Sequence, residues 1–133
     1  MSYGAKNYKQ MQVTTASPGQ LLIMLYEAAI NNVKKASQAI ETKNIADKGK
    51  YIGKAHDIIN ELNNSLNHEV GGDIAIELER LYNFMVTQLM KANFENTKDP
   101  LIAVQKNLET LLDGWKVAVT QFTKDHQPMK KVE

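Results

Sequence analysis

The chain has 133 residues, which suits a single domain over 1–133, and its 16 basic and 15 acidic residues give a net charge of +1. Arg80 is its only arginine, and surfaces that read nucleic acid normally carry clustered arginines and a strong positive excess, so we expect no nucleic-acid binding. Cysteine is absent, which excludes disulfides, and the longest apolar run, from Leu21 to Tyr26, is far too short for stable membrane insertion.

Capping signals divide the chain into helices. Ser17 and Gln20 have the spacing of a capping box, in which each side chain satisfies a backbone amide of the other. Asn44 is a second capping residue, and Asp99-Pro100 is a third signal of the same kind. Between Asn44 and Asp99, the pair Gly71-Gly72 predicts a break that separates the second helix from the third. These signals predict helices at about 18–42, 45–67, 73–96 and 100–123.

Apolar residues recur in steps of three and four within all four predicted helices. The last helix shows the series most clearly: Leu101, Val104, Leu108, Leu111, Trp115, Ala118 and Phe122. Such spacing suits nearly aligned helices packed side by side, and the short linkers force neighbouring helices to run antiparallel. The sequence therefore predicts an all-α fold, an antiparallel four-helix bundle. We expect residues 1–16 to form a flexible N-terminal arm and 124–133 a flexible C-terminal tail.

Histidine chemistry is the main catalytic alternative. A di-metal site in a helical bundle needs Glu-x-x-His motifs, and no glutamate here has a histidine three residues on, so we expect no metal and no cofactor. Phosphotransfer domains are bundles with one exposed histidine, flanked by a small residue and a cation. His56 is instead followed by Asp57, Ile58 and Ile59, which favours an ordinary histidine at the edge of the core.

The predicted bundle has more apolar surface than its core needs. Leu21 to Tyr26 is apolar on every side of its helix, and Ile76, Phe84 and Phe94 fall outside the core arc of the third helix. Two interpretations stay open. The first sixteen residues could fold over this surface as a lid, with Tyr8 as its anchor, or a partner helix could lie there.

Several segments resemble the flagellar secretion chaperone family, and their order and spacing together are specific. The match runs from about Tyr8 to Trp115. It rests on residues 15–21, Met24-Leu25-Tyr26, Lys54-Ala55, Ile58-Ile59-Asn60-Glu61-Leu62, Ser65-Leu66, residues 69–75, Leu78, Leu81-Tyr82, Met85, Ala92-Asn93 and Leu111-Leu112-Asp113-Gly114-Trp115.

The resemblance implies a cytosolic export chaperone without enzymatic activity. Such a protein binds the disordered C-terminal segment of flagellin, prevents premature polymerisation and presents flagellin to a component of the flagellar type III export gate. We place the candidate flagellin-binding site on the arm and along the second and third helices, at Tyr8, Leu62, Leu66, Ile74, Leu78, Leu81, Tyr82 and Met85. A phosphotransfer-like signalling bundle and a self-associating structural bundle are the alternatives.

Overall fold

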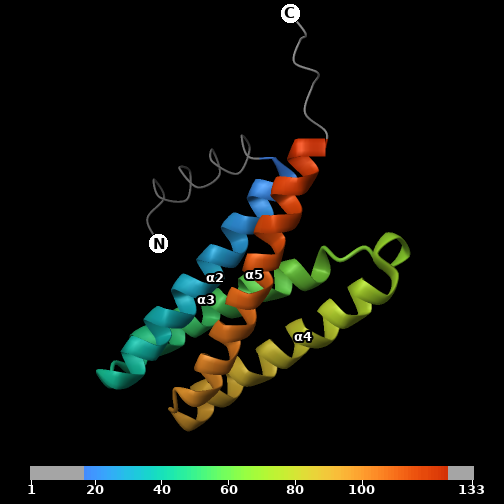
Figure 1. Cartoon of the computed structure of the whole chain (residues 1–133). Coiled ribbons are helices and arrows are strands. Elements are labelled where there is room, and N and C mark those ends of the chain that lie inside the picture. The colour runs from blue at the N-terminus through green and yellow to red at the C-terminus, as the bar shows by residue number, and fades with distance from the viewer. Residues whose placement is uncertain (1–16, 126–133) are drawn as a thin grey trace, which may run out of the picture.

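Four helices make up the described part of the chain, residues 17–125, in a computed structural model (Figure 1). They are α2 (Pro18–Glu41), α3 (Ile45–Asn64), α4 (His68–Glu95) and α5 (Asp99–Asp125). Successive helices run in opposite directions, so the predicted antiparallel four-helix bundle is confirmed. The expected arm, including Tyr8, and most of the expected tail lie outside the described residues.

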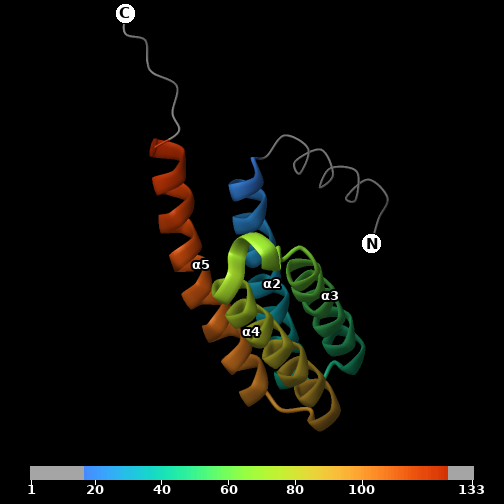
Figure 2. The same ribbon diagram turned by 90° about the vertical axis from the view of Figure 1, so that its right-hand side faces the viewer.

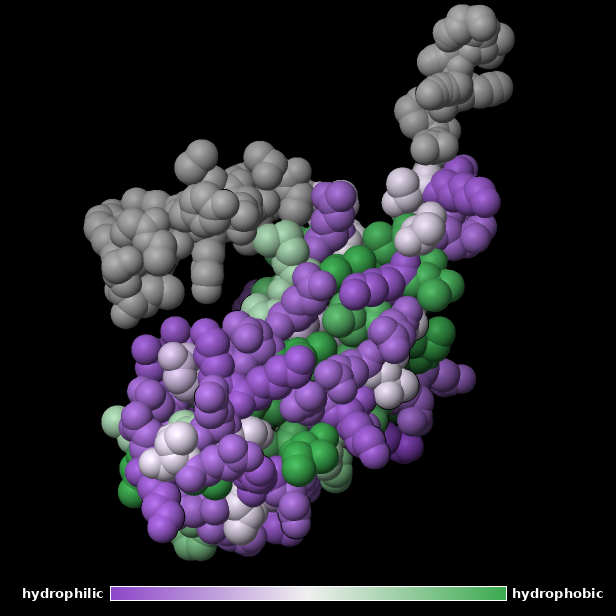
Figure 3. Space-filling view, turned by 60° about the vertical axis from the view of Figure 1, so that its left-hand side comes forward, coloured by the Kyte–Doolittle hydropathy of each residue, from purple (hydrophilic) through white to green (hydrophobic). Residues whose placement is uncertain are grey.

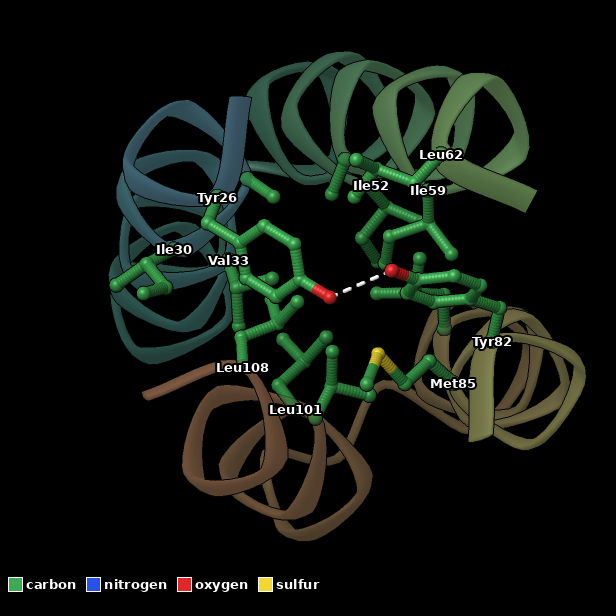
Figure 4. Packing of buried hydrophobic residues seen from close by; sticks show 14 of the residues in the cluster. Tyr26, Ile30, Val33, Ile52, Ile59, Leu62, Tyr82, Met85, Leu101 and Leu108 are labelled. Atoms are coloured by element: carbon green, nitrogen blue, oxygen red, sulfur yellow. Dashed lines mark hydrogen bonds between the residues drawn. The ribbon is translucent and has the colours of Figure 1, made fainter. Parts of the chain in front are cut away.

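The helices form a ring in which α2 and α4 each pack against both α3 and α5. Figure 4 looks into this ring, and side chains from all four helices fill its centre. The largest fully buried side chains are Tyr26, Val33, Ile59, Tyr82, Met85, Leu89, Leu101, Val104 and Leu108. Because α2 and α4 stand diagonally across the ring, contacts between them pass through the core.

The helix starts follow the capping signals of the sequence. The Gln20 amide donates to Ser17 Oγ over 3.2 Å, and the Ser17 amide donates to Gln20 Oε1 over 3.2 Å, which completes the capping box. The Asp47 amide donates to Asn44 Oδ1 over 3.0 Å at the start of α3. These bonds satisfy backbone amides that the first turn of a helix leaves without partners.

The connection between α3 and α4 differs from the prediction. The third helix begins at His68 rather than about residue 73, because Asn67 Oδ1 accepts from the Val70 amide over 3.1 Å and caps a first turn. Gly72 then interrupts this helix with φ 52° and ψ −126°. Glycine adopts this conformation because it has no Cβ. Figure 2 shows the yellow-green first turn bent away from the rest of α4.

Lys48 is buried and ties α3 to the end of α4. Its ammonium group donates to the Asn93 carbonyl over 2.9 Å and also to Asn96 Oδ1. Asn96 is the left-handed C-cap of α4, with φ 55°. The lysine therefore satisfies a carbonyl at the negative end of the α4 dipole, where a positive charge is favourable.

Candidate partner-binding surface

Two tyrosines from diagonal helices meet in the centre of the bundle. The hydroxyl groups of Tyr26 on α2 and Tyr82 on α4 lie 2.6 Å apart and share a hydrogen bond (Figure 4). Burial raises the pKa of Tyr82, and its bond to Tyr26 raises it further. Burial also raises the pKa of Tyr26, although its hydrogen bond to Tyr82 works in the opposite direction. Both hydroxyls therefore stay protonated and serve structure.

Trp115 connects this buried pair to the surface. The Trp115 and Tyr26 rings meet edge to face, with centroids 6.5 Å apart and planes at 61°. Such an arrangement is a favourable one for aromatic rings. Trp115 is only half-buried, and its outer side forms part of a pocket.

The pocket lies between the start of α2 and the end of α5. Its volume is about 420 Å³, and apolar side chains form most of its wall: Pro18, Leu22, Trp115, Ala118, Val119 and Phe122, with Ser17, Gly19 and Thr123 beside them. We call it the open-end pocket. In Figure 3, hydrophobic atoms gather near the end of α5, below its polar last turn.

Gly19 allows α2 and α5 to approach closely at this pocket. A Cβ at Gly19 would lie only 2.9 Å from Val119 Cγ1, which is nearer than real side chains stand. The first turn of α2 and the last turns of α5 are therefore in contact, while Phe122 stays 63% exposed. Ala118 and Phe122 continue the apolar series of the sequence, but both are exposed, because α5 extends beyond the core at this end.

The seven described residues of the predicted flagellin site fall into three groups. Leu62, Leu78, Tyr82 and Met85 are buried in the bundle core, with exposed fractions of 8% or less. Leu66 and Leu81 are half-buried and pack against the edge of that core. Ile74 is 69% exposed, and Tyr8 is outside the described residues. Of this set, an approaching partner can therefore reach Ile74, Leu66 and Leu81 without opening the bundle.

Further apolar side chains are exposed on the outer faces of the helices. Ile76, Phe84 and Phe94, which the sequence placed outside the core arc, are exposed, and Phe94 reaches 89%. Leu22 and Val119, which line the open-end pocket, were not among the predicted site residues. Leu22 belongs to the all-round apolar start of α2, which was the signal that could have found the pocket.

The polar contacts of His56 with other described residues do not suit phosphate. Its Nδ1 lies 3.4 Å from Asp57 Oδ1, and its Nε2 lies 3.5 Å from Asn60 Nδ2. An acidic neighbour repels phosphate rather than neutralising it. Within residues 17–125, no group of three histidine, aspartate or glutamate side chains could hold a metal ion. In the same residues, no helix combines the length and apolar character that a membrane crossing requires.

Comparison with known proteins gives a consistent result. The family described as "Flagellar protein FliS" matches residues 1–122. The chain is 34% identical to a flagellar secretion chaperone FliS of Bacillus subtilis, over 89% of this chain and 87% of the relative. It is 38% identical to the Vibrio cholerae chaperone, over 78% and 76% respectively, and 35% identical to that of Salmonella typhimurium, over 85% and 87%.

A solved structure shares the fold. A crystal structure described as a flagellar chaperone from bacteria superposes with a TM-score of 0.74 and 24% identity, over 89% of this chain and 96% of that one. The match of the family over most of the chain, together with these relatives, confirms the resemblance seen in the sequence. This chain belongs to the FliS family of flagellar secretion chaperones, which are not enzymes.

Proposed function

We propose that this flagellar export chaperone binds the C-terminal segment of flagellin in the cytosol, prevents its premature polymerisation and delivers it to the export gate. The relatives are flagellar secretion chaperones, so the partner is an export substrate of the flagellum. The resemblance described above implies that this substrate is flagellin and that the chaperone keeps it from polymerising before export.

The observation that carries the proposal is the open-end pocket. It is a hollow of about 420 Å³ with a mostly apolar wall, and the described residues leave it open to solvent. An amphipathic helix buries its apolar side chains in such a hollow, usually at positions three and four apart. A flagellin segment that is disordered when free can fold against the pocket and continue over other exposed apolar side chains.

We infer that the proposed surface also includes Ile74 and Leu81 on α4 and Leu66 in the connection that precedes it. All three come from the segments that resemble the family, and all three have side chains that a partner can reach. Leu62, Leu78, Tyr82 and Met85 support the surface from beneath, because they form the core on which α4 rests. The lid formed by residues 1–16, with Tyr8 as anchor, stays a prediction.

Titration with two forms of flagellin tests the partner. Full-length flagellin should bind, and flagellin without its C-terminal segment should not. Incorporation of phosphate at His56 would instead favour the signalling alternative, and concentration-dependent dimers without flagellin binding would favour the structural one.

Two valines on α5 provide a matched test of the pocket. Val119 lines it, whereas Val117 is exposed on another side of the same helix. Val119→Asp places a charge in the apolar hollow and should weaken flagellin binding at least about tenfold, since a buried unpaired charge is costly. Val117→Asp makes the same chemical change and should leave binding within about twofold. Equal losses in both variants would place the flagellin site elsewhere.

A further inference from the structure

A cluster of lysines surrounds one aromatic ring on the outer face of α2 and α3. The ammonium groups of Lys35, Lys50 and Lys54 lie 5.3, 5.2 and 5.8 Å from the centroid of the Tyr51 ring. Lys35 comes from α2 and the others from α3, two helices that lie side by side in Figures 1 and 2. We call these four residues the lysine–tyrosine patch.

The ring of Tyr51 is a fixed platform. It is half-buried and packs against the hydrophobic core from the seam between α2 and α3. The electron-rich face of an aromatic ring attracts cations, which explains why three flexible side chains converge on it. Packing fixes the ring, and the attraction of the ring for cations gathers the three positive charges around it.

No carboxylate among the described residues pairs with these three lysines. Both glutamates of α2 pair with other lysines, since Glu27 pairs with Lys116 over 3.9 Å and Glu41 pairs with Lys98. Asp47 accepts a 2.9 Å hydrogen bond from Asn44 at the cap of α3. The three lysines repel one another, and this repulsion is relieved when an anionic group binds among them.

A hollow beside the ring gives such a group a place to enter. Its volume is about 240 Å³, and Lys35, Gln38, Thr42, Asp47 and Tyr51 line it with Ala39. Lys35 and the Gln38 amide can donate hydrogen bonds into this space. Asp47, which accepts a hydrogen bond from Asn44, also lines this hollow, so a carboxylate enters at the Lys35 side, next to the ring that the lysines surround.

We propose that the lysine–tyrosine patch binds an acidic segment of a partner protein, one with two or three neighbouring carboxylates. The patch is separate from the open-end pocket, because Leu22 and Lys35 lie about 20 Å apart along the axis of α2. The patch provides a second contact with partner proteins. This contact is electrostatic, whereas the contact at the open-end pocket is apolar. It does not depend on flagellin being the occupant of the pocket.

The pattern of charges favours a protein partner over a nucleic acid. A phosphate backbone needs a continuous positive track and is bound best by arginine forks. The patch contains lysine alone, and Asp57 and Glu61 follow Lys54 on α3 by three and seven positions. Helical spacing puts these acids on the same side as Lys54, so the positive area ends there, and its short length suits two or three carboxylates better than a long phosphate backbone.

Binding of a fluorescent oligoglutamate peptide to the full chain tests the patch. The unmodified chain should bind it at low salt and lose it as salt is added, since exposed charges are screened. The triple variant Lys35→Gln/Lys50→Gln/Lys54→Gln should bind at least about tenfold more weakly. A matched variant, Lys91→Gln/Lys106→Gln/Lys124→Gln, has the same net charge with its changes at exposed sites elsewhere, and should stay within about twofold.

Three results would overturn the proposal. The first is no binding of the peptide at low salt, and the second is an equal loss in both triple variants, which would show an effect of net charge alone. The third is tighter binding of a single-stranded oligonucleotide of the same charge, which would identify a nucleic-acid surface. Helix content measured by circular dichroism should be the same in all three chains.

Discussion

The hydroxyls of Tyr26 and Tyr82 are polar groups in an otherwise apolar core. Each loses its hydrogen bonds to water on folding, and the 2.6 Å bond between them replaces part of what is lost. The bond forms only when α2 and α4 stand at one relative height across the ring. It therefore favours this register over alternatives in which apolar side chains alone would pack nearly as well.

Removal of one hydroxyl should cost more than removal of both. Tyr82→Phe leaves the Tyr26 hydroxyl buried without its partner and should lower the free energy of unfolding by about 1–3 kcal/mol. The double variant Tyr26→Phe/Tyr82→Phe leaves no orphaned hydroxyl and should lose less than the sum of the two single changes. Urea denaturation followed by circular dichroism measures all four chains. Strictly additive losses would show that the two hydroxyls do not stabilise each other.

The same pair predicts a loss of stability at alkaline pH. The pKa of both tyrosines is raised by folding from an ordinary value of 10.0, so the folded state keeps protons that the unfolded chain releases. Their contribution is fully present below about pH 10 and falls as the pH rises above it. The double phenylalanine variant should therefore show a weaker decline in urea stability above pH 10. An identical decline would assign the pH dependence to other groups.

Met85 and Ile74 allow stability to be separated from binding within the predicted flagellin site. Met85 is fully buried, so Met85→Ala should cost about 2–5 kcal/mol of unfolding free energy. Ile74 is exposed, so Ile74→Ala should leave the melting temperature nearly unchanged and weaken flagellin binding. Thermal melting and titration calorimetry give the two quantities. Unchanged binding by Ile74→Ala would remove Ile74, and with it the start of α4, from the proposed surface.

At the scale of single helices, local chemistry was predictable and the exact breaks were not. The caps at Ser17 and Asn44 were predicted because they need only neighbours within one turn. The break at Gly71-Gly72 was also located, but as a loop between helices. In the structure, the Asn67 side chain caps a short first turn of α4, and the helix bends at Gly72. Only glycine adopts the positive φ of this bend without strain.

Two glycines in helices should respond oppositely to alanine. Gly72 has φ 52°, where a Cβ is strained, so Gly72→Ala should destabilise by about 1–3 kcal/mol. Gly114 lies inside α5 with ordinary φ and nothing within 4 Å of a Cβ, so Gly114→Ala should stabilise by about 0.5–1 kcal/mol. Denaturant midpoints measure both. A stabilising Gly72→Ala would mean that the bend in α4 is not required by the fold.

For the whole molecule, periodicity predicted the architecture but only part of the surface. Apolar spacing of three and four residues gives the inward face of each helix, and this identified the bundle. Apolar spacing does not show how much of a helix's length the neighbouring helices cover. The apolar side of α5 therefore continues past the core to Phe122, which is 63% exposed and lines the open-end pocket. Spacing also could not separate exposed Ile74 from buried Leu78 on the same helix.

Flagellin binding should carry the heat-capacity change of coupled folding. When a disordered segment folds against apolar surface, both partners lose apolar contact with water, and the heat capacity falls. Burial of roughly 1,000 Å² of apolar surface corresponds to about −0.45 kcal/mol/K. Calorimetric titrations at several temperatures measure this slope.

The Val119→Asp variant gives the control for that slope. It should bind with a smaller heat-capacity change, because part of the apolar contact at the open-end pocket is lost, while Val117→Asp should match the unmodified chain. A slope near zero for full-length flagellin would mean that the segment binds without folding and without burying the pocket. If the slope is large and Val119→Asp does not change it, the segment folds on binding, but its binding site lies on another face of the bundle.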